Sequence, residues 1–276
     1  MTKFNLFRSL NAVFFVLMIL VFTACKSGAD KSTTKELDTE EQEPLKEEVI
    51  ESVTGYPLPS AFEVTKMLNE AGAPYILSIS NPASNVGNYF TQTSKVLNLG
   101  VYGADLSYAS TYMMKQETML YLNASKQLTD EIEISSAFNQ TFATRVETNL
   151  ENADSLISII SESFTDTYNY LTSNNNDRLA ILIMTGSWIE GLYITTQIAA
   201  TAADNSALLE IITHQKSSLK KLLEVMEPIK GDEDVVEISN GLNSLKELYD
   251  GIEDQMSTEI FDRLFTMIEE LRNNIV

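Results

Sequence analysis

Hydrophobic residues recur every three to four positions along most of the chain from Gly55 to Val276, and almost no segment alternates apolar and polar residues as a strand does. The predicted helices are 60–71, 83–112, 114–130, 135–149, 153–173, 177–203, 205–227, 232–250 and 257–274. Their short connections, such as Asn174-Asn175-Asn176, predict antiparallel neighbours. We therefore expect an all-α fold of about eight to nine helices, either a multi-helix bundle or stacked antiparallel helical hairpins.

Two of these helices lack a polar face. The 19 residues between Lys95 and Lys115 hold one charge, Asp105, and the 25 residues between Arg178 and Asp204 hold one charge, Glu190. A helix that is apolar on all sides belongs at the centre of a domain. The second helix is long enough to raise a transmembrane alternative, but its Thr, Ser and Gln side chains make it too polar for lipid. Both are predicted to be buried central helices.

The last predicted helix, 257–274, is amphipathic. Its apolar stripe consists of Ile260, Phe261, Leu264, Phe265, Ile268 and Leu271. The charged residues outside that stripe are Asp262, Arg263, Glu269, Glu270 and Arg272. This pattern predicts a stripe that packs on the core and a charged face in solvent.

The first 24 residues have the three parts of a secretory signal peptide. Lys3 and Arg8 precede an apolar run, AVFFVLMILVF, that is too short to cross a bilayer as a helix. The next residues, Phe22-Thr23-Ala24-Cys25, resemble the lipobox of bacterial lipoproteins, with Phe in place of the usual Leu. This resemblance implies that residues 1–24 are removed and that Cys25, the only cysteine, carries a diacylglycerol and a further acyl chain such as palmitate. Such acyl chains hold a protein firmly at a membrane.

Residues 25–54 form the second part of the predicted organisation, the lipidated cysteine followed by an acidic tether. The stretch 26–54 is rich in Ser, Thr, Glu and Lys and has no aromatic residue, so it is expected to be disordered and extended. Residues 55–276 are then long enough for a single helical domain with its own core. Because the residue after Cys25 is Lys26 and not an acid, analogy with known sorting signals favours the periplasmic face of the outer membrane. The cell surface is the alternative.

The charge of the chain limits its partners. The whole chain has a net charge of −20, and without the signal peptide it has 17 basic and 39 acidic residues, a net charge of −22. Nucleic-acid binding depends on Lys and Arg that neutralise phosphates, so it is not expected. The same charge disfavours adhesion to anionic lipid headgroups, so we expect the lipid on Cys25 to make the membrane contact.

Asp105 and Glu190 are the candidate functional residues, because an isolated buried carboxylate must be paired, hydrogen-bonded or protonated. Each is followed three residues later by a tyrosine, Tyr108 or Tyr193, on the same helical face. The residues that surround them in the sequence include Gly103, Gly186 and Trp188. We expect the two acids to be buried and close together, so that they bind a cationic or hydroxylated ligand or a metal in a polar site between the helices.

A structural interpretation of the same residues stays open. The glycines then allow close helix packing, while the acids accept hydrogen bonds or pair with Arg145 or Arg178. Enzyme templates are poorly matched, because the single histidine, His214, is predicted at the surface and cannot form a multi-histidine metal site. A catalytic triad and a glycine-rich phosphate loop find no support either. A two-carboxylate glycosidase needs no histidine, but it needs an open cleft. No cofactor is expected.

The stretches LNLGVYGADLSYASTY and TGSWIEGLYITTQ, behind a lipobox, resemble an uncharacterised group of all-helical lipoproteins of Bacteroidota. The resemblance covers most of residues 56–276 and implies the fold and the location, but no activity. A second similarity is to imelysin-type periplasmic helical proteins, whose motif is Gly-x-His-x-x-Glu. Gly186, Trp188 and Glu190 stand where that motif would lie, with tryptophan in place of histidine and the glutamate one residue early.

The expected function is therefore non-catalytic: a membrane-anchored helical domain that binds a partner protein or a small ligand in the cell envelope. The alternative is a carboxylate-based hydrolase or an imelysin-like metal-handling protein that uses Asp105 and Glu190.

Overall fold

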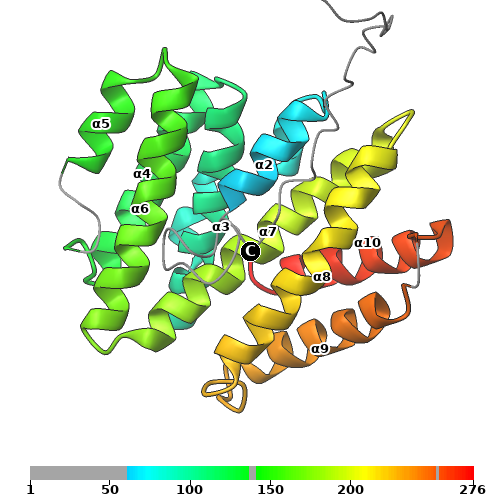
Figure 1. Ribbon diagram of the computed structural model, residues 1–276. Helices are drawn as coiled ribbons and strands as arrows, with labels where there is room; N and C mark the ends of the chain where they lie inside the picture. The colour runs from blue at the N-terminus through cyan, green and yellow to red at the C-terminus, as the bar shows by residue number, and fades with distance from the viewer. Residues whose placement is uncertain (1–60, 137–140, 253–254) are drawn as a thin grey trace, which may run out of the picture. The chain divides into compact units, whose positions relative to one another are not determined.

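The computed structural model of the chain describes residues 61–136, 141–252 and 255–276 (Figure 1). These residues are helical, with turns between the helices and no strand, which confirms the all-α prediction. The predicted signal peptide, the lipidated Cys25 and the tether lie outside the described residues, and those assignments stay predictions.

Nine α-helices and two short 3₁₀ helices lie within the part of the chain that the structure describes, close to the expected number. In chain order they are α2 (Ala61–Glu70), η1 (Leu77–Ile79), η2 (Ala83–Asn88), α3 (Gln92–Thr111), α4 (Lys115–Glu131), α5 (Phe142–Thr148), α6 (Ala153–Ser173), α7 (Asp177–Thr201), α8 (Ser206–Met226), α9 (Val236–Asp250) and α10 (Thr258–Asn273). Most predicted boundaries agree with these to within a few residues, but the helix predicted over 135–149 begins only at Phe142.

The predicted helix over 83–112 is wrong in its first third. The chain forms η2 and then becomes extended at Tyr89, and α3 begins only at Gln92. Thr91 is the reason for the late start, because its side chain accepts a hydrogen bond of 3.0 Å from the Ser94 amide and so caps the new helix. Residues 83–91 are therefore not part of α3.

The centre of the fold is the crossing of α3 and α7, where the two backbones touch. A Cβ atom built on Gly100 would lie 2.0 Å from the Ile183 carbonyl oxygen, and one built on Gly186 would lie 2.0 Å from the Leu97 carbonyl oxygen. No residue with a side chain fits at either point. The two glycines therefore make the crossing, which is the packing role that the structural interpretation assigned to them.

Helix α7 is the one helix of the described residues that is long and apolar enough to cross a membrane, and 94% of its most apolar window is buried inside the fold. It is the central core helix of the domain. Helices α4 and α6 pack on one side of the α3–α7 pair, with α5 on α6 (Figure 1). Helices α8 and α10 pack on α7 on the other side, and α9 packs on α8 and α10. The chain ends where α10 reaches α7, near the middle of the domain.

Candidate functional site

The structure buries both candidate carboxylates completely and brings them together. Asp105 lies on α3, five residues after the crossing point at Gly100, and Glu190 lies on α7, four residues after Gly186. Both residues are 0% exposed. They are close enough that the negative charge of Glu190 raises the pKa of Asp105. The close crossing of the two helices thus creates the site.

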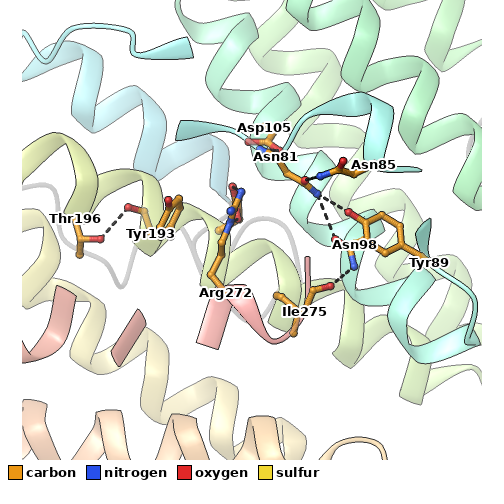
Figure 2. Close-up of polar contacts among 10 residues, drawn as sticks. Asn81, Asn85, Tyr89, Asn98, Asp105, Tyr193, Thr196, Arg272 and Ile275 are labelled. Atoms are coloured by element: carbon orange, nitrogen blue, oxygen red, sulfur yellow. Dashed lines mark hydrogen bonds and ion pairs between the residues drawn. The ribbon is translucent and has the colours of Figure 1, made fainter. Parts of the chain in front are cut away.

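Glu190 is paired with Arg272, which reaches into the site from the last turn of α10. The Arg272 Nε donates to Glu190 Oε2 at 3.1 Å and its Nη2 donates to Oε1 at 3.3 Å, so the pair is bidentate. The Arg272 guanidinium carbon also lies 4.5 Å from the centre of the Tyr193 ring, in a cation–π contact that Figure 2 shows. The Arg272 side chain is only 11% exposed.

This position corrects two expectations. Arg272 lies outside the apolar stripe of α10, as predicted, but that side of the helix faces Glu190 and not solvent. The partners proposed for the acids, Arg145 and Arg178, are engaged elsewhere, with Glu162 and with Asp232 and Asp234. Arg178 cannot reach the site because 12 residues separate it from Glu190 on α7, a rise of about 18 Å along the helix.

Asp105 makes one well-formed hydrogen bond: its Oδ2 accepts from the Asn81 amide at 3.1 Å, whereas Oδ1 makes none within the described residues. Side-chain hydrogen bonding with Asp105 nevertheless lowers the pKa of Glu190, so the two carboxyls lie within reach of each other. Burial raises the pKa of Asp105 well above its ordinary value, and the charge of Glu190 raises it further. Ser80, Arg272 and the Asn81 amide offset only part of this rise. The environment therefore favours the protonated, neutral form of Asp105.

The site as a whole has two carboxyl groups and one guanidinium. Burial also raises the pKa of Glu190, although the charge of Arg272 lowers it. Since Arg272 faces Glu190 in a bidentate pair, Glu190 is the carboxylate that stays ionised and Asp105 is the one that holds the proton. The proton on Asp105 balances the charge of the site.

A segment that we name the strap, residues 73–91, covers Asp105. Two tyrosine hydroxyls bind its backbone: that of Tyr108 on α3 accepts from the Ile76 amide at 2.8 Å, and that of Tyr112, just after α3, donates to the Ala73 carbonyl at 2.8 Å. Tyr108 is buried beside the acid, as expected, but its hydroxyl holds the strap rather than the carboxylate.

Three buried polar atoms at this place lack a hydrogen-bond partner in the described part of the chain: Asp105 Oδ1, Ser80 Oγ and the Tyr75 hydroxyl. They are neighbours, because Ser80 lowers the pKa of Asp105 and the charge of Asp105 adds to the effect of burial in raising that of Tyr75. The Tyr75 ring packs on Tyr108, with ring centres 4.6 Å apart. Buried polar groups are nearly always satisfied, so a group of three that are not is unusual.

Asparagines tie the strap to the end of the chain on the other side of the site. Asn81 donates to the Tyr89 hydroxyl at 2.7 Å and to Asn98 Oδ1 at 3.5 Å, and Asn98 donates to the Ile275 carbonyl (Figure 2). Asn85 donates to Asn81 Oδ1 at 2.9 Å. These atoms satisfy one another, which indicates a structural network that connects the strap to the residues after α10.

The other predicted site residues divide between the site and the core. Tyr193 lies under Arg272 and belongs to the site. Gly186 makes the helix crossing, and Gly103 faces α6, where a Cβ would lie 2.8 Å from Phe164 Cζ. Trp188 is 6% exposed, and its indole N–H has no hydrogen-bond partner among the residues described.

Sequence reasoning missed Arg272, Tyr75, Ser80 and Asn81. Arg272 gave no signal, because 82 residues separate it from Glu190 and it belongs to the charged face of an amphipathic helix. Tyr75 and Ser80 lie in a segment without helical periodicity. The dipeptide Asn81-Pro82 was the one available sign, since it marks a break before α3.

The arrangement restricts the chemistry that the two acids can perform. Within residues 61–136, 141–252 and 255–276, no group of three or more His, Cys, Asp or Glu side chains could hold a metal ion. A cation beside Glu190 would also meet the positive charge of Arg272. A pair of carboxyls that are 0% exposed offers no open cleft for a glycosidic substrate. His214 is exposed on α8, as predicted.

Compared with known proteins, the chain matches no protein-family model, no curated protein and no solved structure.

Proposed function

We propose that this chain is a lipid-anchored, non-catalytic binding domain of the cell envelope, and that it binds a small, positively charged ligand at Asp105. The observation that carries the proposal is the charge count of the site: two fully buried carboxyl groups share one guanidinium, and one carboxylate oxygen lacks a partner. A protonated amine would replace the proton of Asp105 as the second positive charge of the site, and its N–H groups would donate to the carboxylate.

The neighbouring atoms suit such a ligand. The hydroxyl oxygens of Ser80 and Tyr75 make no well-formed hydrogen bond in the described structure, so each can accept an N–H group. Tyr75, Tyr108 and Tyr112 form an aromatic cluster with ring centres 4.6 to 5.6 Å apart, and aromatic faces attract organic cations. The charge of Asp105 contributes, after burial, to raising the pKa of Tyr75 and Tyr108, so these two lie near the acid. A neutral, hydroxylated ligand would satisfy the hydrogen bonds but would leave Asp105 protonated.

Entry of the ligand requires the strap to move. Asn81 on the strap donates to Asp105, whereas Leu77 on the same segment is 56% exposed, so the strap separates the carboxyl from solvent. Hydrogen bonds from tyrosine hydroxyls hold it, each with a net contribution of about 1 kcal/mol. The Asn81 network and the buried side chains of Ile79 and Tyr89 add to these contacts, and all of them must be broken for the strap to open.

The alternatives from the sequence have less support. A metal-handling role needs a cation between the two acids, where Arg272 already neutralises Glu190. A hydrolase needs both carboxyls to act on one substrate, whereas both oxygens of Glu190 are engaged by Arg272. The amine proposal needs only the exchange of one proton on Asp105 for one cationic ligand.

The exchange has a thermodynamic signature. When an amine binds, Asp105 must ionise, so about one proton is released for each ligand bound and the affinity rises with pH. Thermal-shift screening of the purified full chain with putrescine, choline and agmatine, against glycerol as a neutral control, tests for binding. Calorimetry in two buffers with different enthalpies of ionisation then counts the protons.

Asp105→Asn should weaken binding of the amine at least about tenfold, because a charge-assisted hydrogen bond contributes about 1.5–3 kcal/mol. Asp262→Asn is the matched control, since it removes one exposed carboxylate from α10 and should leave binding unchanged. Equal binding by Asp105→Asn and the wild type, or no binding of any amine, would contradict the proposal.

The anchoring part of the proposal rests on the lipobox-like sequence and is tested separately. Cys25→Ser should move the chain from the membrane fraction to the soluble envelope fraction while its circular dichroism spectrum stays the same. A Cys25→Ser chain that remains in the detergent-extracted membrane fraction would contradict lipid anchoring without affecting the proposal for Asp105.

A further inference from the structure

The polar atoms around Asp105 differ in whether the protein itself satisfies them. Four tyrosine hydroxyls are hydrogen-bonded to atoms of the strap: those of Tyr89, Tyr102, Tyr108 and Tyr112. The Tyr75 hydroxyl differs from these, because its oxygen is buried and makes no hydrogen bond within the described residues. The same holds for Ser80 Oγ and Asp105 Oδ1. Buried polar atoms that stay open while their neighbours are satisfied are the ones available to a ligand.

These three open atoms are oxygens, and each can accept a hydrogen bond. Tyr75 and Ser80 lie on the strap, and Ser80 directly precedes Asn81, whose amide donates to Asp105 on α3. Both hydroxyls therefore move with the strap, and closing the strap on a ligand brings them onto the group that Asp105 binds. A primary ammonium group has three N–H donors and no acceptor. Its donors thus equal the open oxygens in number.

The tyrosine rings offer a cation less than the open oxygens do. The ring centres of Tyr75 and Tyr108 are 4.6 Å apart at an interplanar angle of 33°, and those of Tyr108 and Tyr112 are 5.1 Å apart at 71°. The three rings pack against one another and so cover part of one another's faces. A quaternary ammonium has no N–H group, so it would depend on these faces and would leave all three oxygens without a donor.

From these observations we infer that the site at Asp105 selects primary ammonium groups over more highly alkylated ones, and that Ser80 and Tyr75 set this selectivity. The inference rests on the proposed function, because it names the class of amine that binds there. Asp105 supplies the negative charge and accepts one N–H group, and the two hydroxyl oxygens accept the others. An amine with fewer N–H groups leaves a buried oxygen without a donor, which weakens its binding.

Butylammonium and tetramethylammonium provide the test. They are isomers with the same charge at neutral pH, but the first has three N–H groups and the second has none. Titrations of the full chain followed by ligand-observed NMR should show butylammonium binding at least about tenfold tighter than tetramethylammonium, the difference expected for even one charge-assisted hydrogen bond. Diethylammonium, an isomer with two N–H groups, should bind with intermediate affinity.

Ser80→Ala and Tyr75→Phe each remove one open hydroxyl and keep the rest of the side chain. Each should weaken the binding of butylammonium about tenfold and leave that of tetramethylammonium unchanged, so the preference shrinks. Both variants should fold, since neither hydroxyl makes a hydrogen bond in the described structure. Ser218→Ala is the matched control, because it removes another buried open hydroxyl, on α8 and outside the site. It should keep the wild-type preference.

Equal affinities of the isomers, or tighter binding of tetramethylammonium, would overturn the inference and leave the proposed cation site at Asp105 in place. An unchanged preference in both Ser80→Ala and Tyr75→Phe would overturn it too, as would the same loss of preference in Ser218→Ala. Asp105→Asn should weaken the binding of every isomer, because it removes the charge that all of them need. If no isomer binds to the wild type, the proposed function itself is contradicted, and the inference with it.

Discussion

Replacement of Asp105 by Asn should change how the stability of this protein depends on pH. Asn has nearly the shape of a protonated aspartic acid: its oxygen can accept from the Asn81 amide, and its NH₂ group can donate where the acid proton now lies. Unlike the acid, Asn cannot ionise. The variant therefore resembles the neutral form of Asp105 that the wild-type site favours, but residue 105 can no longer gain or lose a proton.

The sign follows from the direction of the pKa shift. Burial and the charge of Glu190 raise the pKa of Asp105 in the folded state above its ordinary value of 3.8. The stabilisation from the bound proton is thus fully present below about pH 3.8, and it is lost as pH rises toward the folded pKa. In that window the folded chain binds one proton more than the unfolded chain at this residue, so the wild type loses stability relative to Asp105→Asn.

The magnitude is set by the number of protons involved. One proton corresponds to about 1.4 kcal/mol per pH unit, so the difference between the two proteins changes by at most about 2.7 kcal/mol from pH 5 to pH 7. The other carboxylates of this acidic chain titrate alike in both proteins and cancel in the difference. We expect similar stabilities near pH 4 and a more stable variant near pH 7.

Urea unfolding of both proteins, followed by circular dichroism between about pH 4 and about pH 8, measures this difference. Asp262→Asn, which removes an exposed carboxylate from α10, should follow the wild type at every pH. Parallel curves for Asp105→Asn and the wild type would refute the reasoning, because they would mean that Asp105 is ionised in the folded protein throughout the range.

Two further variants test how the site and the crossing are built. Glu190→Gln should lower the free energy of unfolding by less than about 3 kcal/mol, since Asp105 can ionise and replace the lost charge. The double variant Asp105→Asn/Glu190→Gln leaves the buried guanidinium without a carboxylate and should lower it by about 3–5 kcal/mol. Additive effects in a double-mutant cycle would exclude this coupling. Gly186→Ala should cost about 3 kcal/mol in urea unfolding, because its Cβ would lie 2.0 Å from the Leu97 carbonyl oxygen. Gly231→Ala, with open space around the added Cβ, should stay within about 0.5 kcal/mol of the wild type, and an equal loss in the two glycine variants would contradict the close crossing.

Much of the fold could be predicted because helical periodicity is a local property of the sequence. Helix α6 has the predicted bounds, and the single charges within the apolar segments identified α3 and α7 as central. The prediction failed between residues 83 and 91, where the composition is compatible with a helix. There the Thr91 side chain competes for the backbone amide of Ser94 and starts a separate helix.

By itself, the sequence determined that Asp105 and Glu190 would be buried, because each is the only charge in a long apolar helix and the domain has to bury such helices. Only the tertiary structure decided which groups pair with these two acids. Arg272 pairs with Glu190 across 82 residues, and the strap donates to Asp105 from a segment without periodicity. The physical reason is that a helical pattern specifies only which face of a helix is apolar. The contact between two charges depends on where the helices cross, and here two glycines and the position of α10 set that geometry.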